Sequence, residues 1–169
     1  MFDESWSDIL CCKGVENTHN ENESLASVDL NLIFLINCSA SLFLAGLIWT
    51  IQLVHYPSFH FVDEHNFKEF HPFHNRRISL LVIPVMITEL LSSGILWWND
   101  GAFSLNGIGF YLVCLIWLST FLLSVPTHAK LAKGKDDTLI MSLVNTNWVR
   151  TILWSVKAGL AVFVLSDLP

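Results

Sequence analysis

Four long apolar runs constrain this 169-residue chain more than any other feature of its sequence. A helix needs about 20 residues, and at least about 17, to cross the hydrocarbon core of a bilayer. The runs satisfy this requirement and make up roughly half of the chain: Leu32–Val54, Ile78–Trp98, Ile108–Val125 and Val149–Leu165. Because they are continuous and do not alternate with period two, they predict membrane-spanning helices rather than the strands of a barrel.

The spacing of these runs predicts an all-α integral membrane protein, a four-helix transmembrane bundle formed by residues 30–169. Residues 1–29 are polar and acidic, and such a segment buries too little apolar surface to fold alone, so we expect a disordered acidic tail. The net charge of −6 comes largely from this tail and predicts no nucleic-acid partner. The expected surroundings are the lipid bilayer.

Basic residues predict the orientation, because short loops rich in Lys and Arg stay in the cytoplasm. Seven of the nine lie after the first run or between the third and fourth runs: Lys68, Arg76, Arg77, Lys130, Lys133, Lys135 and Arg150. We therefore expect cytoplasmic basic loops, with both termini and the 99–106 turn outside the cytoplasm.

Helical spacing continues outside the runs. Phe59, Val62, Phe70 and Phe73 predict an interfacial amphipathic helix between spans 1 and 2 that ends near Pro72. Before the fourth run, Asp136 or Asp137 can cap a helix that begins around Thr138.

Six of the seven histidines lie in the first basic loop or at the cytoplasmic ends of the runs. Neutral imidazole is the commonest transition-metal ligand, so four of them are candidate ligands of iron, copper, zinc or haem: His55, His71, His74 and His128. Because residues 30–169 contain no His-x-x-x-His pair and no Glu-x-x-His pair of the ferritin-like di-iron type, the alternative is imidazoles at headgroup level that bond water or a neighbour.

Two polar stripes should face the bundle interior. On the first run Gln52 precedes His55 by three residues, in line with Asn37 and Ser41. On the fourth, the spacings are three, four and three between Asn147, Arg150, Trp154 and Lys157. Of the tryptophans, Trp49, Trp117 and Trp154 lie inside the runs and are placed to line a cavity.

Glu89 and Lys157 lie at membrane depth, about 16 Å and 12 Å from the same side at the rise of an α-helix. A charge at the bilayer centre costs about 2.5–3.5 kcal/mol on insertion scales, so such groups pair, face a cavity or take part in function. One alternative is a buried Glu89–Lys157 ion pair that only fixes the register of two helices.

The four short spans, together with Asn147-Trp148-Val149-Arg150-Thr151 and Trp154 on the last, resemble a group of small four-helix membrane proteins that includes the anthrone-oxygenase-like family. The resemblance implies a bundle that binds a lipophilic aromatic or quinone-like molecule in its interior.

The sequence therefore favours a membrane protein whose His/Glu/Arg-lined cavity opens toward the cytoplasmic face and binds a metal, haem or lipophilic redox ligand. The candidate catalytic residues are Glu89, His55, Arg150 and Lys157, and the candidate ligand-binding residues are Gln52, Asn147 and Trp154. Whether the chain is an enzyme stays open. The alternatives are a structural or accessory subunit of a membrane complex, including a homo-oligomer, and a proton-coupled carrier.

Overall fold

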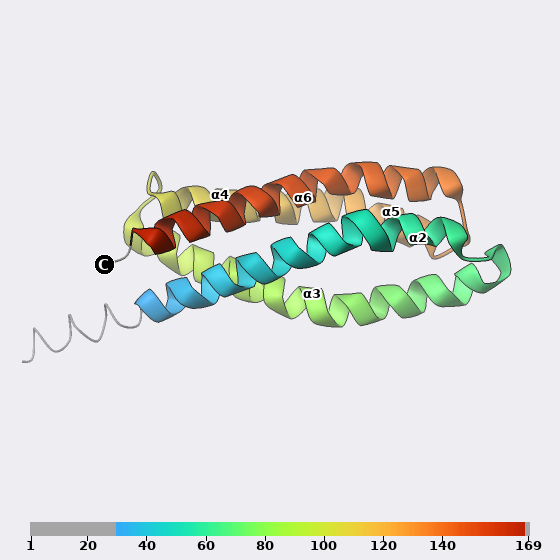
Figure 1. The fold of residues 1–169 in the computed structure, drawn as a ribbon, viewed down its shortest axis with the longest axis horizontal. Coiled ribbons are helices and arrows are strands. Elements are labelled where there is room, and N and C mark those ends of the chain that lie inside the picture. The colour runs from blue at the N-terminus through green and yellow to red at the C-terminus, as the bar shows by residue number, and fades with distance from the viewer. Residues whose placement is uncertain (1–29, 168–169) are drawn as a thin grey trace, which may run out of the picture.

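The computed structural model describes residues 30–167, and these residues are almost entirely helical. The acidic tail predicted for residues 1–29 lies outside the described residues. The described chain forms four helices that lie side by side along the long axis of the molecule (Figure 1). All four are long and apolar enough to cross a membrane. The prediction of an all-α chain with four such helices is confirmed.

The first helix covers Leu30–Phe61, and its last turns are η1 (Ile51–His55), α2 (Tyr56–Ser58) and η2 (Phe59–Phe61). The second, α3, spans Glu64–Asp100. The third helix covers Leu105–Leu131 as α4 (Leu105–Ser119), η3 (Thr120–Ser124) and α5 (Val125–Leu131), and the fourth, α6, spans Asp137–Ser166. The turns at 62–63 and 132–136 lie at one end of the bundle. We call it the cavity end, because the larger cavity of the bundle, described below, lies toward it.

The segment between the first two apolar runs does not form a helix of its own. Phe59 belongs to the end of the first helix, and Phe70 belongs to α3, which continues through Pro72 and Pro84. The prediction that a helix ends near Pro72 is therefore wrong. A proline removes one backbone hydrogen bond, and packing outweighs this loss because Phe67 and His71, which precede Pro72 in α3, are fully buried. The interfacial position of this segment stays a prediction.

The helix ends have ordinary capping chemistry. Asp63 accepts a hydrogen bond from the His65 amide, and Ser104 accepts one from the Gly107 amide, so α3 and α4 each begin at a side-chain cap. Asp136 caps α6 by accepting from the amides of Thr138 and Leu139, which confirms the cap predicted there. The Thr138 hydroxyl and the two amides hold the pKa of Asp136 below its usual range.

Two π-helical turns interrupt the regular helices near the cavity end. They are η1 in the first helix and η3 in the third, and each is followed within two residues by a proline, Pro57 or Pro126. A proline has no N–H to donate to the carbonyl four residues earlier, which favours a wider turn. The extra residue in each wide turn changes which side chains point inward after it.

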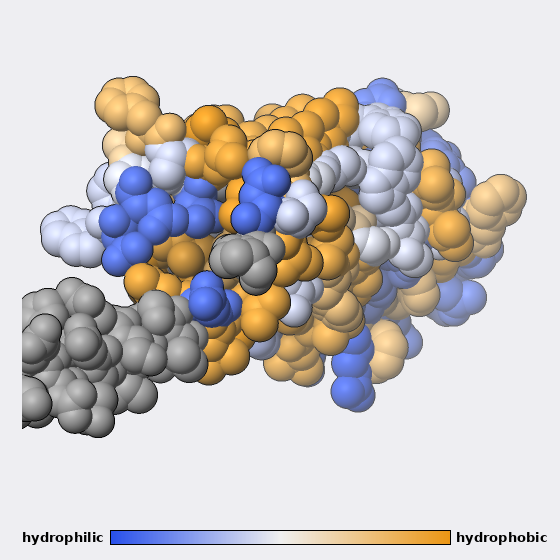
Figure 2. Space-filling model, turned by 60° about the vertical axis from the view of Figure 1, so that its left-hand side comes forward, coloured by the Kyte–Doolittle hydropathy of each residue, from blue (hydrophilic) through white to orange (hydrophobic). Residues whose placement is uncertain are grey.

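The outside of the bundle is apolar. Large side chains such as Leu53, Leu80 and Leu122 are more than half exposed, and Figure 2 shows apolar residues covering much of the visible side, with hydrophilic residues nearer the ends. Such a surface suits helices that face lipid rather than water. The larger cluster of buried apolar side chains lies in the middle of the bundle and toward the cavity end. It includes Leu44, Ile48, Phe59, Phe67 and Ile116.

Candidate functional site

A cavity of about 510 Å³ lies between α3, the third helix, the end of the first helix and α6. Most of its wall is apolar, with Ile78, Val82 and Met86 from α3 and Trp117 and Phe121 from the third helix. Four large polar side chains also line it: Tyr56, His74, His128 and Arg150. An apolar wall with a few placed polar groups is the usual form of a small-molecule site.

Arg150 is the only arginine or lysine in this wall among the described residues. Its side chain is 7% exposed, and its Nη1 donates to Ser124 Oγ over 2.7 Å. Its guanidinium carbon lies 5.4 Å from the centre of the Trp154 ring. Within residues 30–167, no carboxylate forms an ion pair with Arg150, and its Nε is buried without a hydrogen-bond partner.

Tyr56, His128 and His71 form a hydrogen-bonded chain that leads away from the cavity. The Tyr56 hydroxyl lies 3.0 Å from His128 Nε2, and His128 Nδ1 lies 3.1 Å from His71 Nε2. Both ring nitrogens of His128 are therefore engaged. Because an imidazole takes a proton at one nitrogen and releases one at the other, this chain can exchange a proton with a group held beside Tyr56.

The four histidines predicted as metal ligands do come together. The His55 and His74 rings lie 3.9 Å apart, and His55, His71 and His74 all contact the ring of Phe59, with centroids 5.1–5.7 Å from its own. Phe59 thus packs against three of the four imidazoles. In the part of the chain that the structure describes, no three His, Cys, Asp or Glu side chains are arranged to hold a metal ion. The clustering was predicted from the sequence, but the geometry gives the metal or haem hypothesis no support.

Gln52 and Asn147, predicted to bind a ligand, bond to each other instead of lining the cavity. Asn147 Nδ2 donates to Gln52 Oε1 over 2.7 Å, and Gln52 Nε2 donates to the Val144 carbonyl over 3.1 Å. These contacts join the first helix to α6.

His60 and Lys135 make similar contacts at the cavity end. His60 contacts Asp137, and the Lys135 ammonium donates to the carbonyls of His60 and Val62.

A second polar group, the central polar network, lies deeper in the bundle. It consists of Asn37, Ser41, Glu89, Ser92, Ser93, Trp154 and Lys157, all of which are buried. The Glu89 carboxyl accepts from Ser41 Oγ over 2.7 Å and from Trp154 Nε1 over 3.0 Å. Asn37 Nδ2 lies within hydrogen-bond distance of Ser92 Oγ, Ser93 Oγ and the Glu89 carbonyl.

Glu89 and Lys157 share this network without forming the direct ion pair that was one interpretation of the sequence. Lys157 Nζ donates to Asn37 Oδ1 over 2.7 Å, and Asn37 Nδ2 donates to the backbone carbonyl of Glu89, so Asn37 links the two residues. Gly109 of the third helix leaves room for the Lys157 ammonium, because a Cβ at this position would lie 3.2 Å from Lys157 Nζ. The register of the helices is therefore fixed through an amide rather than through an ion pair.

Trp154 connects the central polar network to the cavity. Its indole N–H bonds Glu89, while its ring contacts the guanidinium of Arg150. All four residues of the predicted α6 stripe are buried, which confirms that this face points inward: Asn147, Arg150, Trp154 and Lys157.

Two cavity residues were not predicted from the sequence. Tyr56 has the position of an ordinary interfacial aromatic, and Ser124 lies in an apolar run without a motif. The signal available in the sequence is the proline that follows each of them, Pro57 directly after Tyr56 and Pro126 two residues after Ser124. Trp117, expected to line a cavity, does so, and its indole nitrogen is buried without a partner in the described structure. Trp49 instead donates to Ser155 Oγ.

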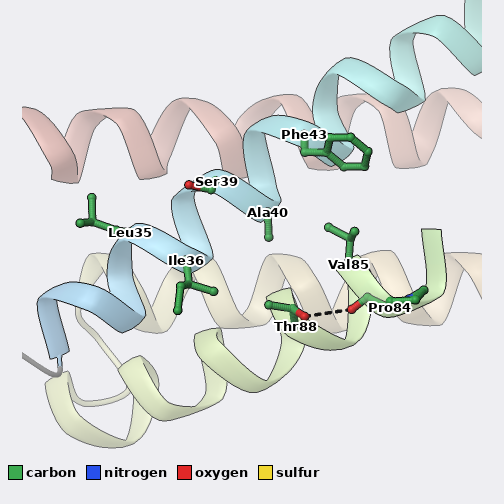
Figure 3. A pocket seen from close by; sticks show the side chains of 8 residues that line it. All are labelled: Leu35, Ile36, Ser39, Ala40, Phe43, Pro84, Val85 and Thr88. Atoms are coloured by element: carbon green, nitrogen blue, oxygen red, sulfur yellow. Dashed lines mark hydrogen bonds between the residues drawn. The ribbon is translucent and has the colours of Figure 1, made fainter. Parts of the chain in front are cut away.

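A second hollow of about 450 Å³ lies between the first helix and α3. Figure 3 shows its lining of apolar side chains with the hydroxyls of Ser39 and Thr88, and Thr88 already donates to the Pro84 carbonyl over 3.0 Å. Among the residues that the structure describes, no ionisable side chain lines this hollow, so it has little with which to orient a ligand.

Comparisons with protein families, curated proteins and solved structures give no match to this chain.

Proposed function

We propose that this chain is an integral membrane protein that binds a lipophilic small molecule in the 510 Å³ cavity, with an oxygen-bearing headgroup against Arg150. The observation that carries the proposal is the state of Arg150, a buried guanidinium in an apolar wall with no carboxylate partner among the described residues. Removing a charge from water is costly unless hydrogen bonds and an opposite charge offset it. A ligand carboxylate or carbonyl supplies that partner.

Other groups of the wall fit the same headgroup. A guanidinium presents parallel N–H donors that suit the two oxygens of a carboxylate. The Trp117 indole N–H is a further buried donor without a partner in residues 30–167, and Tyr56 with His128 offers groups that give or accept a proton. The apolar remainder of the wall suits a hydrocarbon or ring system, including the quinone-like class that the resemblance to the anthrone-oxygenase-like group implies.

The proposed orientation places the cavity in the cytoplasmic half of the membrane. Lys68, Lys130 and Lys133 belong to the cavity end, and basic residues favour the cytoplasmic side. Phe61 and Phe73, which are 91% and 61% exposed at this end, suit insertion at the membrane surface. Both termini then lie outside the cytoplasm.

The test is a binding titration on protein purified in mild detergent. Dodecanoate and a neutral quinone with a ten-carbon tail serve as probes for a carboxylate and a carbonyl headgroup. Hydrogen bonds to charged groups contribute about 1.5–3 kcal/mol, so Arg150→Gln should weaken the bound probe about 10- to 150-fold. Arg76→Gln is the matched control, because it removes an exposed cation from α3 in the half of the bundle that holds the cavity. It should change affinity less than about twofold. Equal binding by folded Arg150→Gln contradicts the proposal.

A second candidate is a subunit of a membrane assembly, and two glycines favour it. A Cβ at Gly46 or Gly159 would meet nothing within 4 Å, so the outer surfaces of the first helix and α6 are open to a closely packed helix. Gly46→Leu or Gly159→Leu should then lower the oligomeric mass measured in detergent by light scattering. An unchanged monomeric mass in wild type and both variants would remove this candidate.

A further inference from the structure

We propose that the ligand enters this cavity sideways from the bilayer, between α3 and the third helix, headgroup first. Its class would be a membrane-resident lipophile with an apolar tail, rather than a water-soluble metabolite. This inference rests on the proposed function, and it replaces the entry from the cytoplasmic face that the sequence suggested. Four observations carry it.

The first observation is the way α3 packs. It lies against α4 along a long contact, but it makes no comparable contact with η3 or α5. The cavity fills this part of the bundle, with wall residues from α3 on one side and from η3 and α5 on the other. The two helices therefore separate from each other at the cavity.

The second observation is the exposure of the residues at the edge. Ile83 of α3, Phe121 of η3 and Val125 of α5 line the cavity, and they are 49%, 58% and 50% exposed. A cavity-lining side chain with about half of its surface exposed marks the rim of an opening. We call these three residues the rim. All three are apolar, as an opening toward acyl chains requires.

The third observation is the change in polarity from the rim inward. The rim is hydrocarbon, whereas the inner wall holds Tyr56, His128 and the Arg150–Ser124 pair. The π turn η3 contributes to both, because Phe121 lies at the rim while the buried Ser124 bonds Arg150. A lipophile that enters here places its headgroup on Arg150 and leaves its tail toward the rim.

The fourth observation is the packing at the cavity end. Phe59, Phe67 and Leu131 have no exposed surface and belong to one apolar core with Ile140 and Leu143. A ligand entering along the bundle axis, among the first helix, α3 and α6, would have to displace them. On the side of the third helix, Ala129 and Ala132 line the cavity and are exposed, so the opening between α3 and the third helix extends to the cavity end without displacing this core.

The experiment measures association rates of two probes with the full chain in nanodiscs. One is a dodecanoate probe that carries a photoreactive diazirine near the end of its tail. The other is butyrate, which has the same carboxylate headgroup and dissolves in water. Ile83→Trp and Val125→Trp narrow the rim. Leu80→Trp and Leu122→Trp are matched controls, because these exposed residues lie on the same helices but do not line the cavity.

Lateral entry predicts that each rim variant slows association of the dodecanoate probe at least fivefold, while the control variants stay within twofold of wild type. Photolysis of the bound probe should label peptides that contain Ile83, Phe121 or Val125. Unchanged association rates in folded rim variants, or labelling confined to the turn at 132–136, would overturn the inference. A wild-type chain that binds dodecanoate with no dependence on Arg150 would instead overturn the proposed function, so the two failures are distinguishable.

Discussion

Lys157 donates its hydrogen bond to the side-chain oxygen of Asn37, 2.7 Å away, and this places an amide between the Lys157 ammonium and the backbone carbonyl of Glu89. The same amide nitrogen contacts Ser92, Ser93 and the Glu89 carbonyl. The Asn37 side chain therefore accepts a hydrogen bond from a cation of α6 and lies within hydrogen-bond distance of polar groups of α3. Losing it leaves a buried ammonium without its hydrogen-bond acceptor.

Asn37→Ala should consequently destabilise the fold strongly. Leaving a buried donor without its hydrogen-bond acceptor costs about 1–3 kcal/mol, and more when the donor is charged. Replacing Lys157 with Met in the same chain removes the unpaired charge and should recover more than half of that loss. Unfolding midpoints in detergent, combined as a double-mutant cycle, measure the coupling. Additive effects of the two substitutions would show that the Asn37–Lys157 contact has no energetic role.

Gly109→Ala tests the space reserved for Lys157. An added Cβ would lie 3.2 Å from Lys157 Nζ and 3.3 Å from Cε, which is closer than normal packing. Ala is favoured over Gly inside a helix by about 1 kcal/mol, so Gly159→Ala, with open space around it, should be neutral or stabilising. Gly109→Ala should instead lower stability by about 1 kcal/mol through overpacking. Equal thermal midpoints for the two variants would contradict this account.

Trp154→Phe separates the two polar groups that this residue joins. Phe keeps an aromatic face for the Arg150 guanidinium but has no N–H for the Glu89 carboxyl. We expect a loss of about 1–3 kcal/mol in unfolding free energy, because a buried acceptor loses a donor. Ligand affinity should change less than about threefold, well below the effect of Arg150→Gln. A large loss of affinity with unchanged stability would reverse the assigned roles.

The Asp136 cap predicts a pH dependence at the start of α6. Hydrogen bonds from Thr138 and Leu139 hold the pKa of Asp136 below the value of about 3.9 found in unfolded chains. A lowered folded-state pKa means that the stabilisation is fully present above pH about 4 and is lost as the pH falls through the folded pKa. Asp136→Ala should lower the thermal midpoint at pH 7, and its difference from wild type should shrink below pH about 4. A constant difference between pH 7 and pH 3 would contradict the cap.

The fold was predictable because continuous apolar runs and a helix cap are local signals. The predicted run that ends at Val54 continues as helix to Phe61, since polar and aromatic turns beyond the apolar part still pack. The inward face of α6 was predictable from its regular spacing. Tyr56 and Ser124 were not, because the π turns before and around them shift the helical register, and a regular repeat carries no trace of that shift. Asn37 could be placed on a stripe, but its position between Glu89 and Lys157 depends on how three helices pack.

The most direct test of the central claim is native mass spectrometry of wild type and Arg150→Gln released from membranes in mild detergent, followed by extraction of the bound small molecules. We expect that wild type carries a lipophile with an oxygen-bearing headgroup, that Arg150→Gln loses most of it, and that Arg76→Gln keeps it. A wild-type chain without any bound lipophile, or the same occupancy in wild type and Arg150→Gln, would contradict the claim that the buried guanidinium of Arg150 is the ligand's anchor.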